Sequence, residues 1–167
     1  MKLRRKNQNK TIERNRFKIA GHFEREIRND IKNKMKAPLY KISEDFGKLI
    51  DVYLLKYTFE DEPEMISGIK LVFENGVVFH EALPDTDEIT CESNQQFDYD
   101  IEICVSNYSA WNKAIGKSVV WIWSMTNQQG YNDAIQYSFK DKNGEEFIVQ
   151  FIVIASEIKF YETQKKV

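Results

Sequence analysis

Cysteine and histidine are scarce in this sequence. Its 167 residues include two of each: Cys91, Cys104, His22 and His80. Because the four lie in separate regions, they do not form the ligand spacing of a structural zinc site. The residues around both cysteines are acidic, and acidic surroundings disfavour a reactive thiolate. We therefore expect no bound metal, no cofactor and two inert thiols.

Long apolar runs are also missing. No run approaches the ~18 residues that a membrane-spanning helix needs, and the chain does not open with a charged and then apolar signal segment. We therefore expect a cytoplasmic protein without a membrane span. Hydrophobic residues make up 42% of the chain and aromatic residues 13%, which is enough to fill the core of one domain.

Basic residues are absent over a long stretch. From Leu71 to Asn112 there is no Lys or Arg, yet this stretch contains nine Asp and Glu residues. Residues 1–36, in contrast, hold thirteen Lys and Arg and four acidic residues, which gives them a net charge of +9 against −11 for residues 37–167. The charge distribution predicts a basic arm at 1–36 joined to an acidic domain at 37–167.

The basic arm has the pattern of an amphipathic helix. Apolar residues recur in it at steps of three and four: Phe17, Ala20, Phe23, Ile27 and Ile31. We expect a helix from Ile12 to Lys34, with Pro38 preventing its continuation. The arm could dock on its own acidic domain, contact nucleic acid or anionic lipid, or pair with another chain. Docking on its own domain is the hypothesis we favour.

Beyond Pro38 the apolar residues alternate, as in antiparallel strands. The expected strands are 49–59, 66–74, 77–83, 97–105, 119–125, 135–139 and 147–155, and residues 157–162 either extend the last of these or add an edge strand. A short helix is expected near 108–115, capped by Ser106 or Asn107 and ended by Gly116. The prediction is an α+β fold with a single antiparallel-rich sheet of about six to eight strands.

One turn can be predicted in detail. Asn75-Gly76 suits a two-residue type I′ turn between two strands. Such a turn places Phe73 opposite Val78 and Leu71 opposite His80. His80 would then share a face with these apolar residues and lie at the edge of the core.

His80 and its neighbour Glu81 could be mistaken for an acid/base pair. Adjacent residues of a strand point to opposite faces of the sheet, so the two side chains cannot easily act together. We therefore expect a neutral core histidine and a separate carboxylate.

Two tryptophans, Trp121 and Trp123, stand at alternate positions of an expected strand. We predict that both are buried, on one face with Val119 and Met125, because each indole can bury about 150 to 250 Å². A stacking platform for bases or sugars would need exposed indoles with basic residues nearby, whereas this domain is acidic.

Acidic residues are the leading candidates for a binding surface. Asp98, Asp100 and Glu102 alternate along one expected strand, so they share a face. Their spacing is too wide for all three to ligate one small cation, unless loop acids such as Asp85 or Asp87 join them. A surface for a basic partner is one hypothesis and a solvated face is the other. The candidate partner-binding residues are Asp85, Asp87, Glu88, Asp98, Asp100 and Glu102.

A polar loop, residues 127–133, is a second candidate site, because loops on rigid sheets often carry function. Its candidate ligand-binding residues are Asn127, Gln129, Tyr131 and Asp133. In the alternative interpretation, Gly130 supplies a positive φ and the amides cap the turn.

Residues 47–162 resemble small bacterial cytoplasmic domains of unknown function, some of which are similar to immunity proteins encoded beside secreted toxins. The resemblance covers "GKLIDVYLL" and "WIWSMTNQQGYNDAIQYSF". It implies an inhibitor that binds a basic protein, commonly a cationic nuclease toxin, without chemistry of its own. The first hypothesis is thus a non-enzymatic binding protein with an acidic surface. The alternative is an enzyme or small-ligand-binding protein with its site at 127–133.

Overall fold

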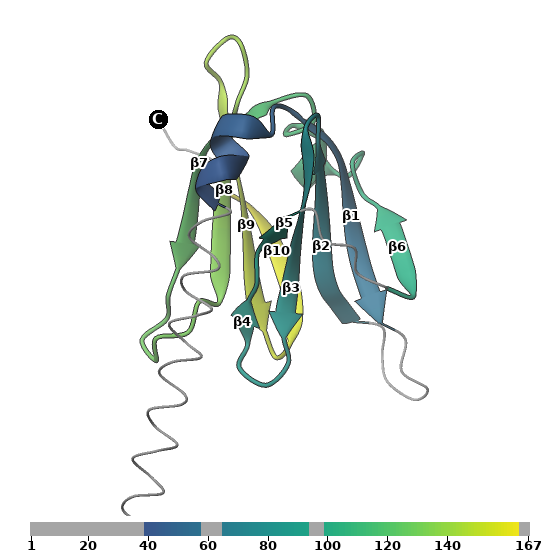
Figure 1. Cartoon of the computed structure of the whole chain (residues 1–167), viewed down its shortest axis with the longest axis vertical. Helices are drawn as coiled ribbons and strands as arrows, with labels where there is room; N and C mark the ends of the chain where they lie inside the picture. The colour runs from purple at the N-terminus through teal and green to yellow at the C-terminus, as the bar shows by residue number, and fades with distance from the viewer. Residues whose placement is uncertain (1–38, 58–64, 94–98, 164–167) are drawn as a thin grey trace, which may run out of the picture. The chain divides into compact units, whose positions relative to one another are not determined.

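The computed structural model describes residues 39–57, 65–93 and 99–163 (Figure 1). The predicted helix Ile12–Lys34, the predicted boundary at Pro38 and the candidate residue Asp98 lie outside these ranges. The described part of the chain is mostly antiparallel β-sheet. It also contains a helical segment at 39–45 and the short helix α2 at Ser109–Asn112.

The strands form two sheets. The first sheet contains β1 Leu49–Tyr57, β2 Met65–Phe73, β3 Gly76–Leu83, β4 Glu88–Ile89, β5 Glu92–Ser93 and β6 Ile101–Cys104, in the order β4-β3-β2-β1-β6 with β5 paired to β3. The second contains β7 Ser118–Met125, β8 Ala134–Lys140, β9 Glu146–Ile154 and β10 Glu157–Thr163, in the order β10-β9-β8-β7. The prediction of a single sheet is therefore wrong.

The two sheets separate where the chain passes through α2. β6 pairs with β1, whereas β7 pairs with β8. An isolated bridge between Lys48 and Ser118 links the beginnings of β1 and β7. Alternation predicts that strands exist, but it carries no information about which of them are neighbours.

The core lies between the inner faces of the two sheets, which pack face to face (Figure 1). The His80 ring of β3 lies 5.6 Å from the Tyr137 ring of β8 and 5.3 Å from the Phe151 ring of β9. Trp111 of α2 lies 5.6 Å from Phe151 and is fully buried. The prediction of a core position for His80 is thus confirmed.

The β2–β3 turn differs from the predicted one. Phe73 pairs with Gly76 and Leu71 pairs with Val78, so Glu74 and Asn75 form the turn. Neither Asn75 nor Gly76 has a positive φ, which a type I′ turn at these residues would require. The predicted register was wrong by two residues, which leaves the same residues on the inner face.

Contacts with residues 45 and 46, which precede β1, explain this register. The backbone N–H of Asn75 donates to the carbonyl of Phe46 at 3.1 Å, and its side-chain amide donates to the carbonyl of Asp45 at 3.2 Å. A Cβ on Gly76 would lie 2.6 Å from Cε2 of Phe46. Gly76 is therefore needed for the close approach of an aromatic ring rather than for its φ angle.

The two tryptophans of β7 are exposed, so the prediction that they are buried is wrong. Trp121 is 61% exposed and Trp123 is 41% exposed. The buried tryptophan is Trp111, which lies in α2.

A β-bulge explains the exposure of the two tryptophans. Val119 is buried and pairs with Phe139, but the register shifts by one residue before Trp121. Beyond the shift, Ile122 pairs with the buried Tyr137. The extra residue reverses which positions face the core, so Trp121 points away from it.

The helix α2 is shorter than predicted. It begins after Tyr108 and has no side-chain cap. The Ser106 hydroxyl, one of the two predicted caps, donates instead to the Asp51 carboxylate at 3.0 Å. Gly116 has a φ of 78°, in the left-handed region, but it does not end the helix as predicted, because α2 ends at Asn112 with Lys113 as its C-cap.

Deletion of residues 1–34 is expected to leave a folded domain. The buried hydrophobic residues of the described part, which begins at residue 39, already form a core shared by two sheets. We expect a cooperative urea unfolding transition for residues 35–167, followed by circular dichroism. Loss of that cooperativity in the truncated protein would show that the arm is part of the folding unit.

Candidate functional site

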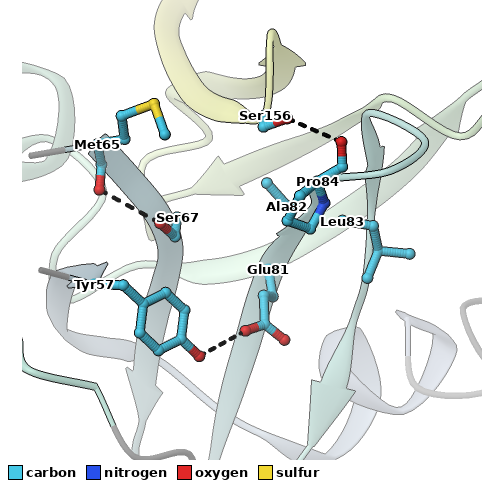
Figure 2. Close-up of a pocket in the computed structure, with 8 residues that line it drawn as sticks. All are labelled: Tyr57, Met65, Ser67, Glu81, Ala82, Leu83, Pro84 and Ser156. Atoms are coloured by element: carbon cyan, nitrogen blue, oxygen red, sulfur yellow. Dashed lines mark hydrogen bonds between the residues drawn. The ribbon is translucent and has the colours of Figure 1, made fainter. Parts of the chain in front are cut away.

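A pocket of about 630 Å³ lies at one end of the first sheet, next to the turn between β9 and β10 (Figure 2). β1 contributes its last residue and β2 contributes residues near its start. β3 contributes its last three residues. Among the lining residues are Tyr57, Met65, Ser67, Glu81, Leu83 and Ser156.

Glu81 is the charged group of this pocket. The Tyr57 hydroxyl donates to Oε1 of Glu81 at 3.0 Å, and the Tyr99 hydroxyl donates to the same oxygen at 3.4 Å. The two tyrosine rings lie 5.0 Å apart. Burial, followed by the negative charge of Glu81, raises the pKa of both phenols. Both hydroxyls therefore keep their protons and act as donors to the carboxylate.

Two features of the strands place Glu81 in the pocket. Its neighbour His80 is buried between the sheets, so Glu81 points to the opposite face, as predicted. Across the pair of strands, Gly68 lies opposite Glu81. A Cβ on Gly68 would lie 3.1 Å from the Tyr99 hydroxyl, so the glycine leaves room for Tyr99 to reach the carboxylate.

No Lys or Arg of the described residues forms an ion pair with Glu81. The ion pairs in which both partners are described lie elsewhere: Lys70 with Glu102, Lys113 with Glu162 and Lys159 with Glu157. The described ranges contain 17 Asp and Glu residues against nine lysines and no arginine. The pocket carboxylate therefore lies in a domain with an excess of negative charge.

The wall formed by Ser156 is held in place by the β3–β4 connection. Ala155 and Ser156 form the β9–β10 turn with φ angles of 51° and 63°, as a two-residue type I′ turn requires. The Asp87 carboxylate accepts from the Ser156 backbone N–H at 2.7 Å, and the Ser156 hydroxyl donates to the Pro84 carbonyl at 3.0 Å. These bonds fix the Ser156 hydroxyl at the pocket.

The acidic loop predicted as a binding surface is divided by the structure. Asp85 is exposed, whereas Asp87 holds the β9–β10 turn. Glu88 is 2% exposed, and its carboxylate accepts from the backbone N–H of Asn132 at 3.3 Å. Glu88 is therefore buried and does not belong to a binding surface. Its hydrogen bond connects β4 to the loop before β8.

The predicted carboxylate row is also changed. Asp100 and Glu102 are exposed, and Glu102 forms an ion pair of 2.9 Å with Lys70. Lys70 reaches it from β2 across β1, with its ammonium 4.8 Å from the ring centroid of Tyr53. Lys70 lies just before the stretch without Lys or Arg, which begins at Leu71. The ion pair was not predicted, because it depends on which strands are neighbours.

The polar loop at 127–133 is a self-contained turn. Oδ1 of Asn127 accepts from the backbone N–H groups of Gln129 at 2.9 Å and Tyr131 at 3.2 Å. The Asn127 side-chain amide donates to the Asp133 carboxylate at 3.0 Å. Gly130 has a φ of 88°. These observations fit the capping interpretation, because the polar groups bind one another.

The cysteines and possible metal ligands offer no second site in the described ranges. Both Cys91 and Cys104 are free, and burial raises the pKa of the Cys91 thiol. No group of three or more His, Cys, Asp or Glu side chains there could hold a metal ion. No helix of the described part is long and apolar enough to cross a membrane.

Sequence analysis did not identify Glu81, Tyr57 or Ser67 as site residues. They come from three strands, and the residues between them carry no motif. One signal was present, because the isolated Gly68 within a strand indicates the close approach of another group. The sequence does not show that this group is the hydroxyl of Tyr99.

Comparison with known proteins identifies a family. No curated protein and no solved structure matches the chain. The model of a family of unknown function, DUF6334, matches residues 35–166, which is most of the chain. The chain therefore belongs to the DUF6334 family.

Proposed function

We propose that the domain is a non-enzymatic, cytoplasmic binding protein that takes a positively charged group of a basic partner protein into the pocket at Glu81. One observation carries the proposal. Within the described residues, Glu81 lines a pocket, accepts two tyrosine hydroxyls and forms no ion pair with a cation.

A partly buried carboxylate is costly unless a cation or several donors offset the lost hydration. Tyr57 and Tyr99 supply two neutral donors, both to the same oxygen of Glu81. A bound cation would add a charge-assisted hydrogen bond, which is about twice as strong as a neutral one.

The charge of the domain supports a basic partner. Its excess of carboxylates over lysines creates a negative potential that raises the rate of encounter with cations. Asp85 and Asp100 remain exposed and add to this potential. An immunity-type inhibitor of a cationic toxin is one protein of this kind. The alternative site at 127–133 receives less support, because its polar groups bind one another.

Glu81→Gln is expected to weaken the binding of a cationic peptide at least about tenfold, because one unit of charge is lost inside the pocket. Glutamine keeps the oxygen that accepts from Tyr57 and Tyr99. The measurement is isothermal titration of the full chain with a peptide of alternating lysine, arginine and glycine, at low and moderate salt.

The matched control is Glu145→Gln. Glu145 is exposed in the β8–β9 connection, so this variant removes the same charge far from the pocket in the chain. We expect a change below about twofold, since the charge is exposed and screened. Equal losses in the two variants would mean that net charge alone attracts the peptide, and no binding by the parent would reject the proposal.

A further inference from the structure

We infer that the outer edge of β7 is an interface at which two copies of this chain pair in antiparallel fashion, so that the second sheet continues into a second molecule. This inference does not depend on the pocket at Glu81. It follows from the place of β7 in its sheet, from its composition and from the exposure of its side chains.

β7 lies at the end of the second sheet and pairs with β8 on one side (Figure 1). On its other side, Ser118 forms an isolated bridge with Lys48. From Val119 to Met125, no strand or loop of the described residues forms a hydrogen bond with this outer side. Such an edge presents a row of unpaired N–H and C=O groups, which is a template for another strand.

The other edge strands of the described sheets are protected in ways that β7 is not. β4 and β5 have two residues each, and β6 has four, including Glu102. β10 carries three charged residues, Glu157, Lys159 and Glu162. β7 has eight residues without a charge, a proline or a glycine. Because natural edge strands are usually short, charged or interrupted, β7 is the described edge that is open to pairing.

The side chains of β7 are exposed and uncharged. Trp121 and Trp123 are exposed on one face of the strand, and Ser124 is exposed as well. From Ser118 to Asn132 the chain has no charged residue. Exposed apolar groups that lie together mark interaction sites. Two copies of this acidic domain repel each other where their carboxylates meet, and contact along an uncharged edge avoids that repulsion.

A second copy of β7 fits this edge. In antiparallel pairing about a two-fold axis at Trp123, this residue lies opposite the same residue of the other copy, and Trp121 lies opposite the other copy's Met125. The pairing uses only residues beyond the bulge, which lies before Trp121. Aromatic side chains directly opposite each other stabilise an antiparallel pair. Each copy therefore supplies the uncharged, aromatic strand that the other needs, in the two-fold arrangement that is commonest among oligomers.

The dimer is expected to be weak. The half-exposed indoles of Trp121 and Trp123 in the two copies can bury about 300 to 500 Å² between them. Pairing of the two strand segments adds backbone contacts, but the total stays below the roughly 1,200 Å² at which standard interfaces begin. We therefore expect a Kd on the order of 10 to 100 µM.

Sedimentation velocity of the full chain, at concentrations from below to above this Kd, measures the dimer. Trp123→Lys should raise the Kd at least about tenfold, because a charge at the centre of a paired edge opposes pairing. Ser124→Lys should act in the same way, although it leaves both indoles in place. Far-UV circular dichroism checks that both variants are folded. In the parent, backbone amides of residues 121–125 should gain protection from hydrogen exchange as the concentration rises.

The matched control is Tyr161→Lys. Tyr161 is exposed on β10, at the opposite edge of the same sheet, and register pairs through Gln136 and Gln150 place it in one row with Trp123. We expect the Kd of this variant to change less than about twofold. Equal losses in Tyr161→Lys and Trp123→Lys would show that two sheet faces stack, which would overturn edge pairing. A parent that stays monomeric, or β7 variants that dimerise as well as the parent, would also overturn it.

Discussion

Trp111→Ala is expected to lower the free energy of unfolding by about 3 to 5 kcal/mol, the usual cost of removing a fully buried large aromatic. The Trp111 side chain is completely buried, and its ring lies 5.6 Å from Phe151 and 6.3 Å from Phe160. Its indole N–H has no hydrogen-bond partner among the described residues. The expected loss therefore comes from packing and a cavity, with no hydrogen bond broken.

The comparison is with the two exposed tryptophans. Trp121→Ala and Trp123→Ala should each cost less than about 1 kcal/mol, because exposed positions contribute little. Urea unfolding of the three variants, followed by far-UV circular dichroism, measures the difference. If Trp121→Ala were as damaging as Trp111→Ala, the bulge in β7 would be wrong and both indoles would belong to the core.

The stability of the domain is expected to fall by about 2 kcal/mol between about pH 7 and about pH 5 because of one residue, His80. Its ring is fully buried, with Nδ1 2.9 Å from the Thr90 carbonyl and Nε2 2.7 Å from the Tyr137 hydroxyl. A carbonyl can only accept, so Nδ1 carries the proton and Nε2 accepts from Tyr137. Both hydrogen bonds fit the neutral ring.

The direction of this pH dependence follows from the pKa of His80 in the folded and unfolded states. Burial lowers the pKa of His80 from 6.5 to about 4 in the folded protein. Below about pH 6.5 the unfolded chain binds a proton that the folded chain does not, so unfolding becomes easier as the pH falls. The loss continues until the pH reaches the folded pKa and is absent well above 6.5.

His80→Gln provides the test. Glutamine retains one donor for Thr90 and one acceptor for Tyr137 but does not titrate. The difference in unfolding free energy between the two pH values should therefore be about 2 kcal/mol smaller in the variant, and all other titrating groups cancel in the comparison. An NMR titration of the His80 ring measures the pKa directly. Identical pH dependence in parent and variant would contradict the prediction.

Alternation along the chain was sufficient to predict most strands. β1, β2, β3, β7, β8, β9 and β10 all fall where apolar residues recur at every second position. This pattern is local, because a half-buried strand needs its own residues to alternate. The division into two sheets was not predictable in the same way, since the pairing of β6 with β1 depends on residues about fifty positions apart.

Local signals failed where distant contacts decide the structure. Asn75-Gly76 has the composition of a type I′ turn, yet Phe46 packs on Gly76 and shifts the register. The bulge before Trp121 inserts one residue without any Gly or Pro to mark it. The pocket likewise depends on the meeting of Tyr57, Glu81 and Ser156, which come from three parts of the chain.

The bulge in β7 also determines what the protein's intrinsic fluorescence reports. The chain has three tryptophans, and two of them are exposed to solvent in the folded state. Trp121 and Trp123 emit from a polar environment before and after unfolding, and a soluble quencher such as iodide can collide with them in both states. The change in emission on unfolding therefore comes mainly from Trp111. In this protein, tryptophan fluorescence is a local probe of how α2 packs against β9, and circular dichroism is the better probe of the sheets.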